Sequence, residues 1–125
     1  MRKIFFTIML STLILPVMAD VNEEIYTKLF ISRFNVCMPF KMEQSLKNNT
    51  VQYNRHIAGW KAHKCRYNET EIINNTSKEY SCQFSRDEVT ALTQAMRSDS
   101  MGQGVAKIEW DKMKQDKNVC QSPLK

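Results

Sequence analysis

The residues best equipped for chemistry lie in residues 44–68, a stretch that contains no aspartate or glutamate. Positive charge interleaved with aromatic rings is typical of a surface that binds an anionic partner, such as an acidic protein, a lipid phosphate, a cell-wall polymer or a nucleic acid. The plainer alternative is that the tyrosines face the core while the lysines only solvate the other face of a sheet. The basic, imidazole and aromatic residues of the stretch are Lys47, Tyr53, Arg55, His56, Trp60, Lys61, His63, Lys64, Arg66 and Tyr67.

The turn between two expected strands is the best candidate for a binding surface within this stretch. Trp60 lies near the tip of that turn, and an exposed tryptophan in a turn is often an anchor at a protein interface. A protein partner is favoured, and an acidic one would suit the charge. The predicted binding residues are Arg55, Trp60, Lys61, Lys64 and Arg66.

The sequence offers little for catalysis or metal binding. His56 and His63 lie near Cys65, but no carboxylate accompanies them and the cysteine is of more use in a disulfide, so we expect no metal and no cofactor. The chain has no G-x-S-x-G, H-E-x-x-H or P-loop motif, and residues 102–104 carry only an isolated G-x-G. The sequence therefore favours a binding protein over an enzyme.

Four cysteines form an even set without a C-x-x-C pair, which favours disulfides over a zinc site. Three pairings are possible. We expect Cys65–Cys82, which would join two neighbouring strands, and Cys37–Cys120, which would tie the end of the first helix to the C-terminal tail. The first of these bonds requires a wide or irregular turn, because the midpoint between its cysteines misses the centre of the turn predicted at residues 74–77.

Residues 1–19 have the three parts of a cleavable signal peptide: a basic start at Arg2 and Lys3, an uncharged apolar run, and a small residue at Ala19. The apolar run is too short for a transmembrane helix, which needs about 20 apolar residues. Residues 20–125 are then expected to form one exported domain, periplasmic or extracellular. It keeps 16 of the 18 Lys and Arg residues against 13 Asp and Glu, a mild excess that speaks against a dedicated nucleic-acid binder.

Helix and strand patterns follow one another at the start of this domain. Residues 20–34 predict a helix with one apolar face, capped by Asp20 or Asn22. Residues 34–42 alternate like a strand, and Pro39 predicts that it is an edge strand or an extended crossing, because proline cannot donate to a ladder.

Three further segments predict a β-meander. The first begins at Val51 and bends at Ala58-Gly59, because the residue that follows falls out of phase with the alternation. Turns at residues 60–64 and 74–77 separate it from two more strands, and the third strand has the cleanest alternation in the chain.

Helical signals return after the meander. Ser85 and Glu88 form a capping box that predicts a helix over residues 86–99. Residues 105–117 fit both the strand and the helix period, and we favour a short helix or a turn. The predicted fold class is therefore α+β: a small antiparallel sheet of three to four strands, packed by the N-terminal helix and the capped helix, and stapled by disulfides.

These features favour a small periplasmic or secreted protein that works by binding, of an inhibitor or immunity type acting on another protein. One alternative is an accessory subunit of a cell-envelope or secretion assembly. Another is a small hydrolase, whose activity would have to depend on His56 or His63. The sequence carries no indication of the oligomeric state.

Overall fold

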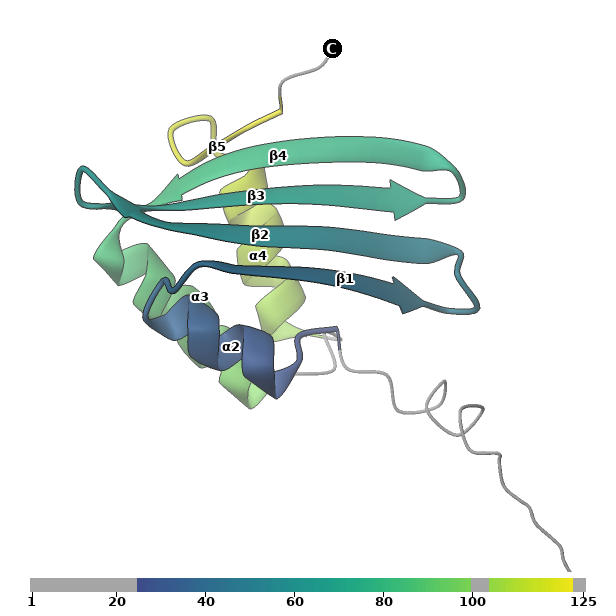
Figure 1. Cartoon of the computed structure of the whole chain (residues 1–125), viewed down its shortest axis with the longest axis horizontal. Coiled ribbons are helices and arrows are strands. Elements are labelled where there is room, and N and C mark those ends of the chain that lie inside the picture. The colour runs from purple at the N-terminus through teal and green to yellow at the C-terminus, as the bar shows by residue number, and fades with distance from the viewer. Residues whose placement is uncertain (1–24, 100–103, 123–125) are drawn as a thin grey trace, which may run out of the picture.

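The computed structural model describes residues 25–99 and 104–122, which form one five-stranded antiparallel sheet and three helices (Figure 1). The strands lie in the sheet in the order in which they occur in the chain, β1-β2-β3-β4-β5. The helices pack on one face of this sheet. The elements are α2 (Lys28–Asn35), β1 (Phe40–Leu46), β2 (Val51–Lys61), β3 (Lys64–Ile73), β4 (Thr76–Phe84), α3 (Arg86–Ser98), α4 (Val105–Gln115) and β5 (Cys120–Gln121).

The α+β class with disulfides is confirmed, but the number of strands and the arrangement of the helices differ from the prediction. The sheet has five strands rather than three or four, because β1 and the two-residue β5 flank the meander. A third helix, α4, joins the two helices that the prediction packs against the sheet. Of the two predictions for residues 105–117, a short helix or a turn, the structure shows the helix, which ends at Gln115.

The first helix begins later than the sequence predicts. Its N-cap is Thr27, whose hydroxyl accepts a hydrogen bond from the Phe30 N–H, and the two residues before this cap are not helical. A threonine hydroxyl satisfies one of the N–H groups that the first turn of a helix leaves free, so it fixes the start of the helix. The predicted caps, Asp20 and Asn22, lie outside the described residues, as does the predicted signal peptide, residues 1–19.

The strand predicted over residues 34–42 is wrong in its first part. Helix α2 continues to Asn35, and β1 begins only at Phe40, directly after Pro39. Proline has a fixed φ and no N–H to donate, so it precedes the strand rather than lying within it. The edge position is confirmed, because β1 is the outermost strand of the sheet beside β2.

The two turns of the meander are each two residues long and use positive φ. Ala62 and His63 join β2 to β3 with φ of 53° and 67°, and Asn74 and Asn75 join β3 to β4 with φ of 50° and 67°. Turns of this kind match the right-handed twist of the strands that they connect. Both turns therefore lie where the sequence predicts them, but they are narrower.

A bulge occurs in β2 where the sequence predicts a bend. The pairing with β3 shifts between Ile57 and Gly59, so that Trp60 lies opposite Cys65 and on the same face of the sheet. Gly59 has a φ of 115°, and a Cβ at this position would lie 3.4 Å from Cγ of Pro39. The bulge thus depends on a glycine, and it turns the tryptophan towards the helices.

The capping box at the start of α3 is confirmed. The Ser85 hydroxyl accepts a hydrogen bond from the Glu88 N–H at 3.1 Å, and the Glu88 carboxylate accepts one from the Ser85 N–H at 2.8 Å. Each side chain satisfies a backbone donor of the other residue, which fixes where the helix begins.

The disulfide pairing predicted from the sequence is wrong. The bonds join Cys37 to Cys65 and Cys82 to Cys120. In the β3–β4 ladder Cys65 lies opposite Phe84, two positions from Cys82, and such diagonal neighbours are roughly 7–8 Å apart, too far for a disulfide. Cys82 instead lies directly opposite Cys120 of β5, with a Cα–Cα distance of 4.0 Å.

The two bonds tie the end of α2 to β3 and the C-terminal strand to β4. Disulfides of this kind are consistent with an oxidising, exported environment. Within residues 25–99 and 104–122, no helix has the length and apolar character needed to cross a membrane.

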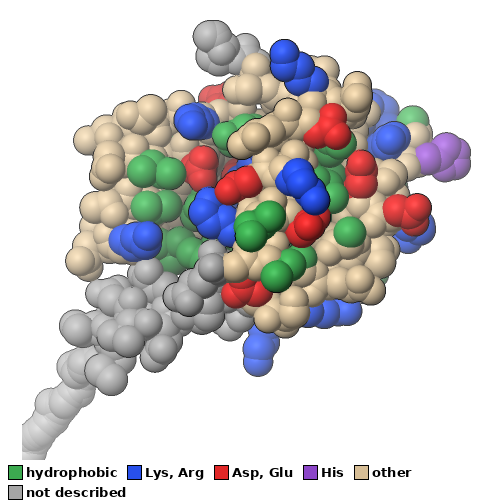
Figure 2. Space-filling model, turned by 180° about the vertical axis from the view of Figure 1, so that it is seen from behind, with side chains coloured by type: hydrophobic (Ala, Val, Ile, Leu, Met, Phe, Trp, Pro, Cys, Tyr) green, Lys and Arg blue, Asp and Glu red, His purple; other side chains and the backbone are tan. Residues whose placement is uncertain are grey.

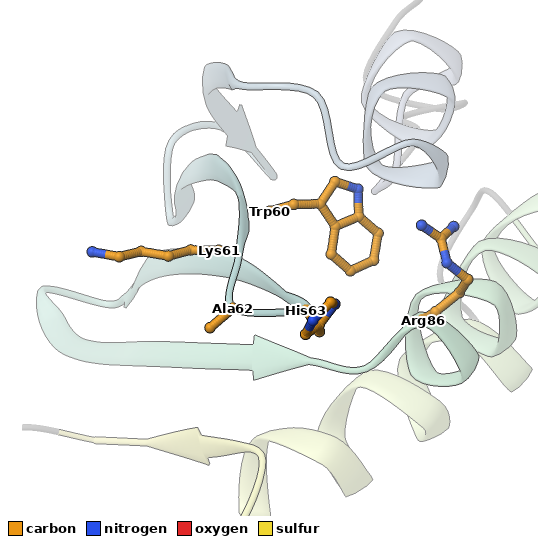
Figure 3. Close-up of a pocket in the computed structure, with 5 residues that line it drawn as sticks. All are labelled: Trp60, Lys61, Ala62, His63 and Arg86. Carbon is orange, nitrogen blue, oxygen red and sulfur yellow. The ribbon is translucent and has the colours of Figure 1, made fainter.

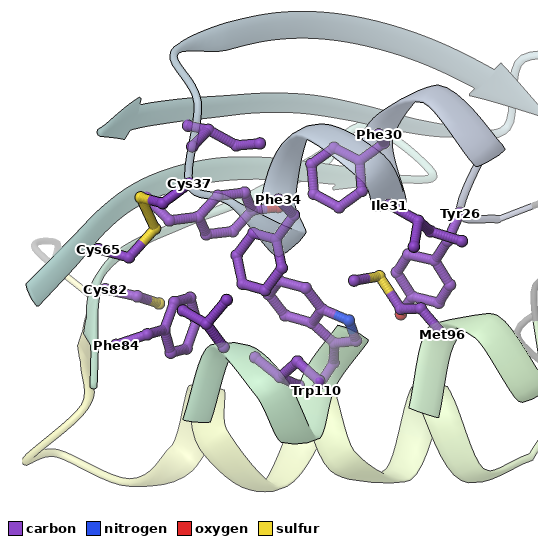
Figure 4. Close-up of a cluster of buried hydrophobic side chains, with 14 of the residues drawn as sticks. Tyr26, Phe30, Ile31, Phe34, Cys37, Cys65, Cys82, Phe84, Met96 and Trp110 are labelled. Atoms are coloured by element: carbon purple, nitrogen blue, oxygen red, sulfur yellow. A yellow bond between two sulfur atoms is a disulfide. The ribbon is translucent and has the colours of Figure 1, made fainter. Parts of the chain in front are cut away.

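The core lies between the sheet and the helices and is rich in aromatic rings (Figure 4). Two helices and two strands contribute these rings, and each of the residues is at most 2% exposed: Phe30 and Phe34 of α2, Tyr67 of β3, Phe84 of β4 and Trp110 of α4. Ring centroids of the contacting pairs are 5.2–6.4 Å apart, mostly in the tilted and edge arrangements that aromatic pairs prefer. This cluster fixes the helices on the sheet.

Candidate functional site

A pocket of about 400 Å³ lies where the β2–β3 hairpin meets the start of α3. Figure 3 shows that Trp60 and Arg86 point towards each other across it, whereas Lys61 points away. We define the hairpin-end surface as the residues lining this pocket together with the neighbouring lysine of β3: Trp60, Lys61, Ala62, His63, Lys64 and Arg86.

The indole of Trp60 is held on two sides. Its Nε1–H donates a hydrogen bond to the carbonyl oxygen of Val36, the C-cap of α2, at 3.1 Å. The guanidinium of Arg86 lies 4.6 Å from the centroid of the ring, a contact worth about 0.5–1 kcal/mol at an exposed site. The Cys37–Cys65 bond is adjacent, because Cys65 lies opposite the tryptophan. The ring is therefore fixed in place, although the residue as a whole is 36% exposed.

Positive charge gathers at this end of the sheet. Lys61 and Lys64 lie directly opposite each other at the last pair of the β2–β3 ladder, and both are exposed. Like charges in this arrangement destabilise a hairpin. Across the part of the chain that the structure describes, no ion pair involves these lysines, Arg66 or Arg86. The hairpin end thus carries a concentrated positive field at some cost in stability.

Exposed apolar side chains lie beside this charge. Val36 and Met38, in the segment to which Trp60 is hydrogen-bonded, are 52% and 44% exposed. An apolar centre with a charged rim is the usual anatomy of a protein–protein interface.

Four of the five predicted binding residues lie at this end of the molecule, and one does not. Lys64 and Arg66 project from the face of β3 opposite to the helices, because they alternate with buried Cys65. Arg55 lies in mid-strand, is in phase with buried Ile57 and is only 3% exposed. Its assignment to a surface for a partner is therefore corrected.

Arg55 belongs instead to a buried ionic cluster that the sequence reasoning missed. It lies directly opposite Glu69, with Nε 3.6 Å from Oε1, and both side chains are 2% exposed. The other oxygen of Glu69 accepts a hydrogen bond from Lys114 of α4, and the Tyr67 hydroxyl donates to Oε1 at 2.6 Å. One carboxylate thus joins the two central strands to a helix.

Neutral groups accept hydrogen bonds from one terminal nitrogen of the Arg55 guanidinium and lie against its face. Nη1 donates to the carbonyl oxygen of Ile25 at 2.7 Å and to the side-chain oxygen of Gln44 at 2.9 Å. The ring centroids of Tyr26 and Tyr53 lie 5.0 and 4.3 Å from Cζ. The cluster therefore contains two buried cations and one buried carboxylate.

The neighbouring charges and the burial of the cluster set the protonation states of Glu69 and of the tyrosines. Burial raises the pKa of the Glu69 carboxyl, but the ammonium of Lys114 and the guanidinium of Arg55 outweigh burial and hold that pKa below its ordinary value. Burial raises the pKa of Tyr53 to about 12 and the pKa of Tyr67 well above its ordinary value. At neutral pH the glutamate is charged and the tyrosine hydroxyls are neutral hydrogen-bond donors.

The two histidines are not brought together. His56 pairs with Asn68 within the β2–β3 ladder, whereas His63 lies in the turn, so at about 3.3 Å per residue they are roughly 15 Å or more apart. Among the residues given a place in the structure, no three His, Cys, Asp or Glu side chains gather as a metal ion would require.

One sequence signal pointed to the buried cluster. Glu69 continues the alternation of Cys65 and Tyr67, which places it on the core face of its strand, where a carboxylate requires a partner. No such signal exists for Lys114, because its contact with Glu69 spans 45 residues.

Comparison of the chain with protein-family models, curated proteins and solved structures gives no match. The geometry of the hairpin end and of the buried cluster is therefore the basis for inferring function.

Proposed function

We propose that this protein is a small exported binding protein of the inhibitor or immunity type, and that its hairpin-end surface holds an acidic region of a protein partner. The observation that carries the proposal is the fixed and partly exposed Trp60 beside cations that form no ion pair with any residue the structure describes. Tryptophan is the residue type most often found at the energetic centre of an interface.

The rigidity of the hairpin end supports this proposal. Binding is more favourable when the contacting side chains are ordered before the partner arrives. Trp60 is ordered by its hydrogen bond to Val36 and by the guanidinium of Arg86, and the Cys37–Cys65 bond fastens the hairpin to α2. A partner would therefore meet a surface that is already formed.

The charges indicate the chemistry of the partner. Aspartate or glutamate side chains of the partner would pair with Arg86 beside the indole and with Lys61 and Lys64 on the other side of the hairpin tip, and an apolar side chain would lie against the indole. Complementary charge mainly accelerates association and excludes wrong partners, whereas the buried aromatic contact supplies most of the affinity. The expected partner is thus a protein with an acidic surface that includes an apolar residue.

The test is affinity capture from the extract and culture medium of the protein's own cells, with the tagged and oxidised domain (residues 20–125) as bait. Four baits are compared: the wild type, K61E/K64E, W60A and the control K78E/K117E. The control reverses the same number of lysines, which are exposed in β4 and after α4.

A single near-stoichiometric protein should be retained by the wild type and by the control. K61E/K64E should not retain it, and W60A should bind it about 30-fold more weakly, as for an interface residue worth about 2 kcal/mol. Equal capture by all four baits would refute the surface. Retention of a set of envelope or secretion components would replace the inhibitor proposal with that of an accessory subunit.

A further inference from the structure

The outer edge of β1 is open along the whole strand. No described strand lies beyond β1 (Figure 1), whereas β5 covers one end of β4 at Ser81 and Cys82. In an antiparallel sheet every second residue of an edge strand directs its N–H and C=O groups away from the neighbouring strand. These unpaired groups are a template on which a further strand can pair.

The exposed side chains of β1 include two opposite charges. Lys41 and Glu43 lie on the face of the sheet away from the helices, because they alternate with Met42, which packs against the core. Their neighbours across the β1–β2 ladder are His56 and Asn54. Neither charge forms an ion pair with any residue that the structure describes. Both are therefore available to a neighbouring molecule.

The charges of α4 differ in this respect, because they pair within the chain. Seen from the side of this helix, acidic and basic side chains lie next to one another on the surface (Figure 2). Lys107 pairs with Asp111 at 2.9 Å, and Lys112 pairs with Glu109 at 3.5 Å. The helix thus offers a second molecule less unpaired charge than β1 does.

A second copy of β1 complements the charges of the first in one register. In a symmetric antiparallel pair the two strands meet around a two-fold axis, and residues directly opposite each other point to the same face. With the axis at Met42, Lys41 of each copy lies opposite Glu43 of the other. With the axis one residue earlier or later, Lys41 or Glu43 lies opposite itself, and like charges in this position are destabilising. Charge therefore selects the register centred on Met42.

We propose that two copies of this chain pair through β1 in this register, so that their five-stranded sheets become continuous. The Lys41–Glu43 ion pair forms twice, and backbone hydrogen bonds join residues 40–44 of the two copies. A lone lysine on an edge strand discourages such pairing, but here the glutamate of the second copy neutralises it. The interface is small, so the dimer is weak and its formation depends on protein concentration.

The two hairpin-end surfaces lie at opposite ends of the joined sheet, because the paired strands are antiparallel. Dimer formation does not use these surfaces, which are built from the β2–β3 hairpin and the start of α3. The dimer is therefore independent of the proposed function, and each copy keeps its own surface for a partner.

Sedimentation equilibrium of the oxidised domain (residues 20–125) tests the pairing between about 10 µM and about 1 mM, the range in which a small interface associates. At low ionic strength the wild type should pass from the monomer mass to twice that mass. A wild type that stays monomeric throughout this range, or that assembles beyond the dimer, would overturn the proposal, because a two-fold pair is closed.

Charge reversals test the register. K41E and E43K each place like charges opposite each other on both sides of the two-fold axis, so each should weaken the dimer about tenfold or more. The double variant K41E/E43K exchanges the two charges and should dimerise as the wild type does. An equimolar mixture of the single variants should form a heterodimer, since one carries only acids and the other only bases at these two positions.

Matched controls reverse charges at exposed residues of β4, in K78E and in E79K. Both should dimerise as the wild type does, and so should K61E/K64E, which separates this outcome from that of the capture experiment. Equal association of the wild type, K41E and E43K would contradict pairing through β1. Single variants that lose the dimer without its recovery in the mixture and in K41E/E43K would contradict the register.

Discussion

Arg55 and Glu69 face each other from neighbouring strands, with Nε 3.6 Å from Oε1 and with both side chains 2% exposed. Burial of such a pair is unfavourable unless further hydrogen bonds complete it. Here Lys114 and Tyr67 donate to the same carboxylate. The cluster lies midway along β2, between the start of the strand at Val51 and the hairpin-end surface at Trp60, and it fastens α4 to the sheet.

Replacing Glu69 by glutamine should destabilise the fold by about 3–5 kcal/mol, because two buried cations would lose their counter-charge. Unfolding in guanidinium chloride at neutral pH measures this change. The control Glu109→Gln removes a pair with Lys112 whose side chains are 29% and 69% exposed, and it should change the free energy of unfolding by less than about 1 kcal/mol. Similar effects of the two substitutions would contradict the role of the cluster.

The stability contributed by Glu69 should disappear in acid. Its pKa in the folded protein lies below the ordinary value of 4.5, so the unfolded chain binds the proton at a higher pH than the folded protein does. The contribution is therefore complete above about pH 4.5 and is lost as the pH falls through the folded-state pKa. Urea unfolding at a series of pH values should show the difference between wild type and E69Q shrinking over this range. If the difference in the free energy of unfolding between wild type and E69Q stays constant as the pH falls, Glu69 does not contribute stability through its charge.

In alkali the tyrosines should ionise late. Burial raises the pKa of Tyr53 from 10.0 to about 12 and the pKa of Tyr67 well above 10.0, so the folded protein keeps protons that the unfolded chain loses. Stability should therefore fall as the pH rises above 10.0. Tyrosinate absorbance should increase together with the loss of far-ultraviolet circular dichroism. The prediction fails if all tyrosines titrate with ordinary pKa values while the protein stays folded.

Peptide mapping without reduction should recover Cys37 joined to Cys65 and Cys82 joined to Cys120. Replacing the cysteines of either bond by serine should lower the free energy of unfolding by about 4 kcal/mol, from chain entropy for separations of 28 and 38 residues. A peptide that joins Cys65 to Cys82 would show that the β3–β4 register is different.

Elements with a local signal could be predicted from the sequence. The alternation of the meander, the bend at Ala58-Gly59 and the capping box of Ser85 and Glu88 are all read from a few adjacent residues, and all are present. The disulfides depend on the width of one turn, which local pattern does not give. The two-residue turn at residues 74–75 sets a register that separates the two cysteines predicted to pair.

In the candidate site, too, some residues have a local sequence signal and others depend on tertiary packing. Trp60 could be identified because it follows a bulge and precedes a turn. The run of basic residues predicts Arg55 at the same surface, but alternation along β2 puts Arg55 in phase with Ile57 and hence in the core. The contact of Lys114 with Glu69 comes from the packing of a helix on a distant strand, which no pattern in the sequence encodes.

The most direct test of the hairpin-end surface is photo-crosslinking in cells that contain the native partner. A photo-reactive phenylalanine analogue replaces His63 in one protein and the exposed Lys78 of β4 in a control. The proposal predicts that one acidic protein is crosslinked from position 63 and not from position 78, and that K61E/K64E abolishes the crosslink. Crosslinking of the same partner from position 78 alone, or unchanged crosslinking in the presence of K61E/K64E, would contradict the proposal.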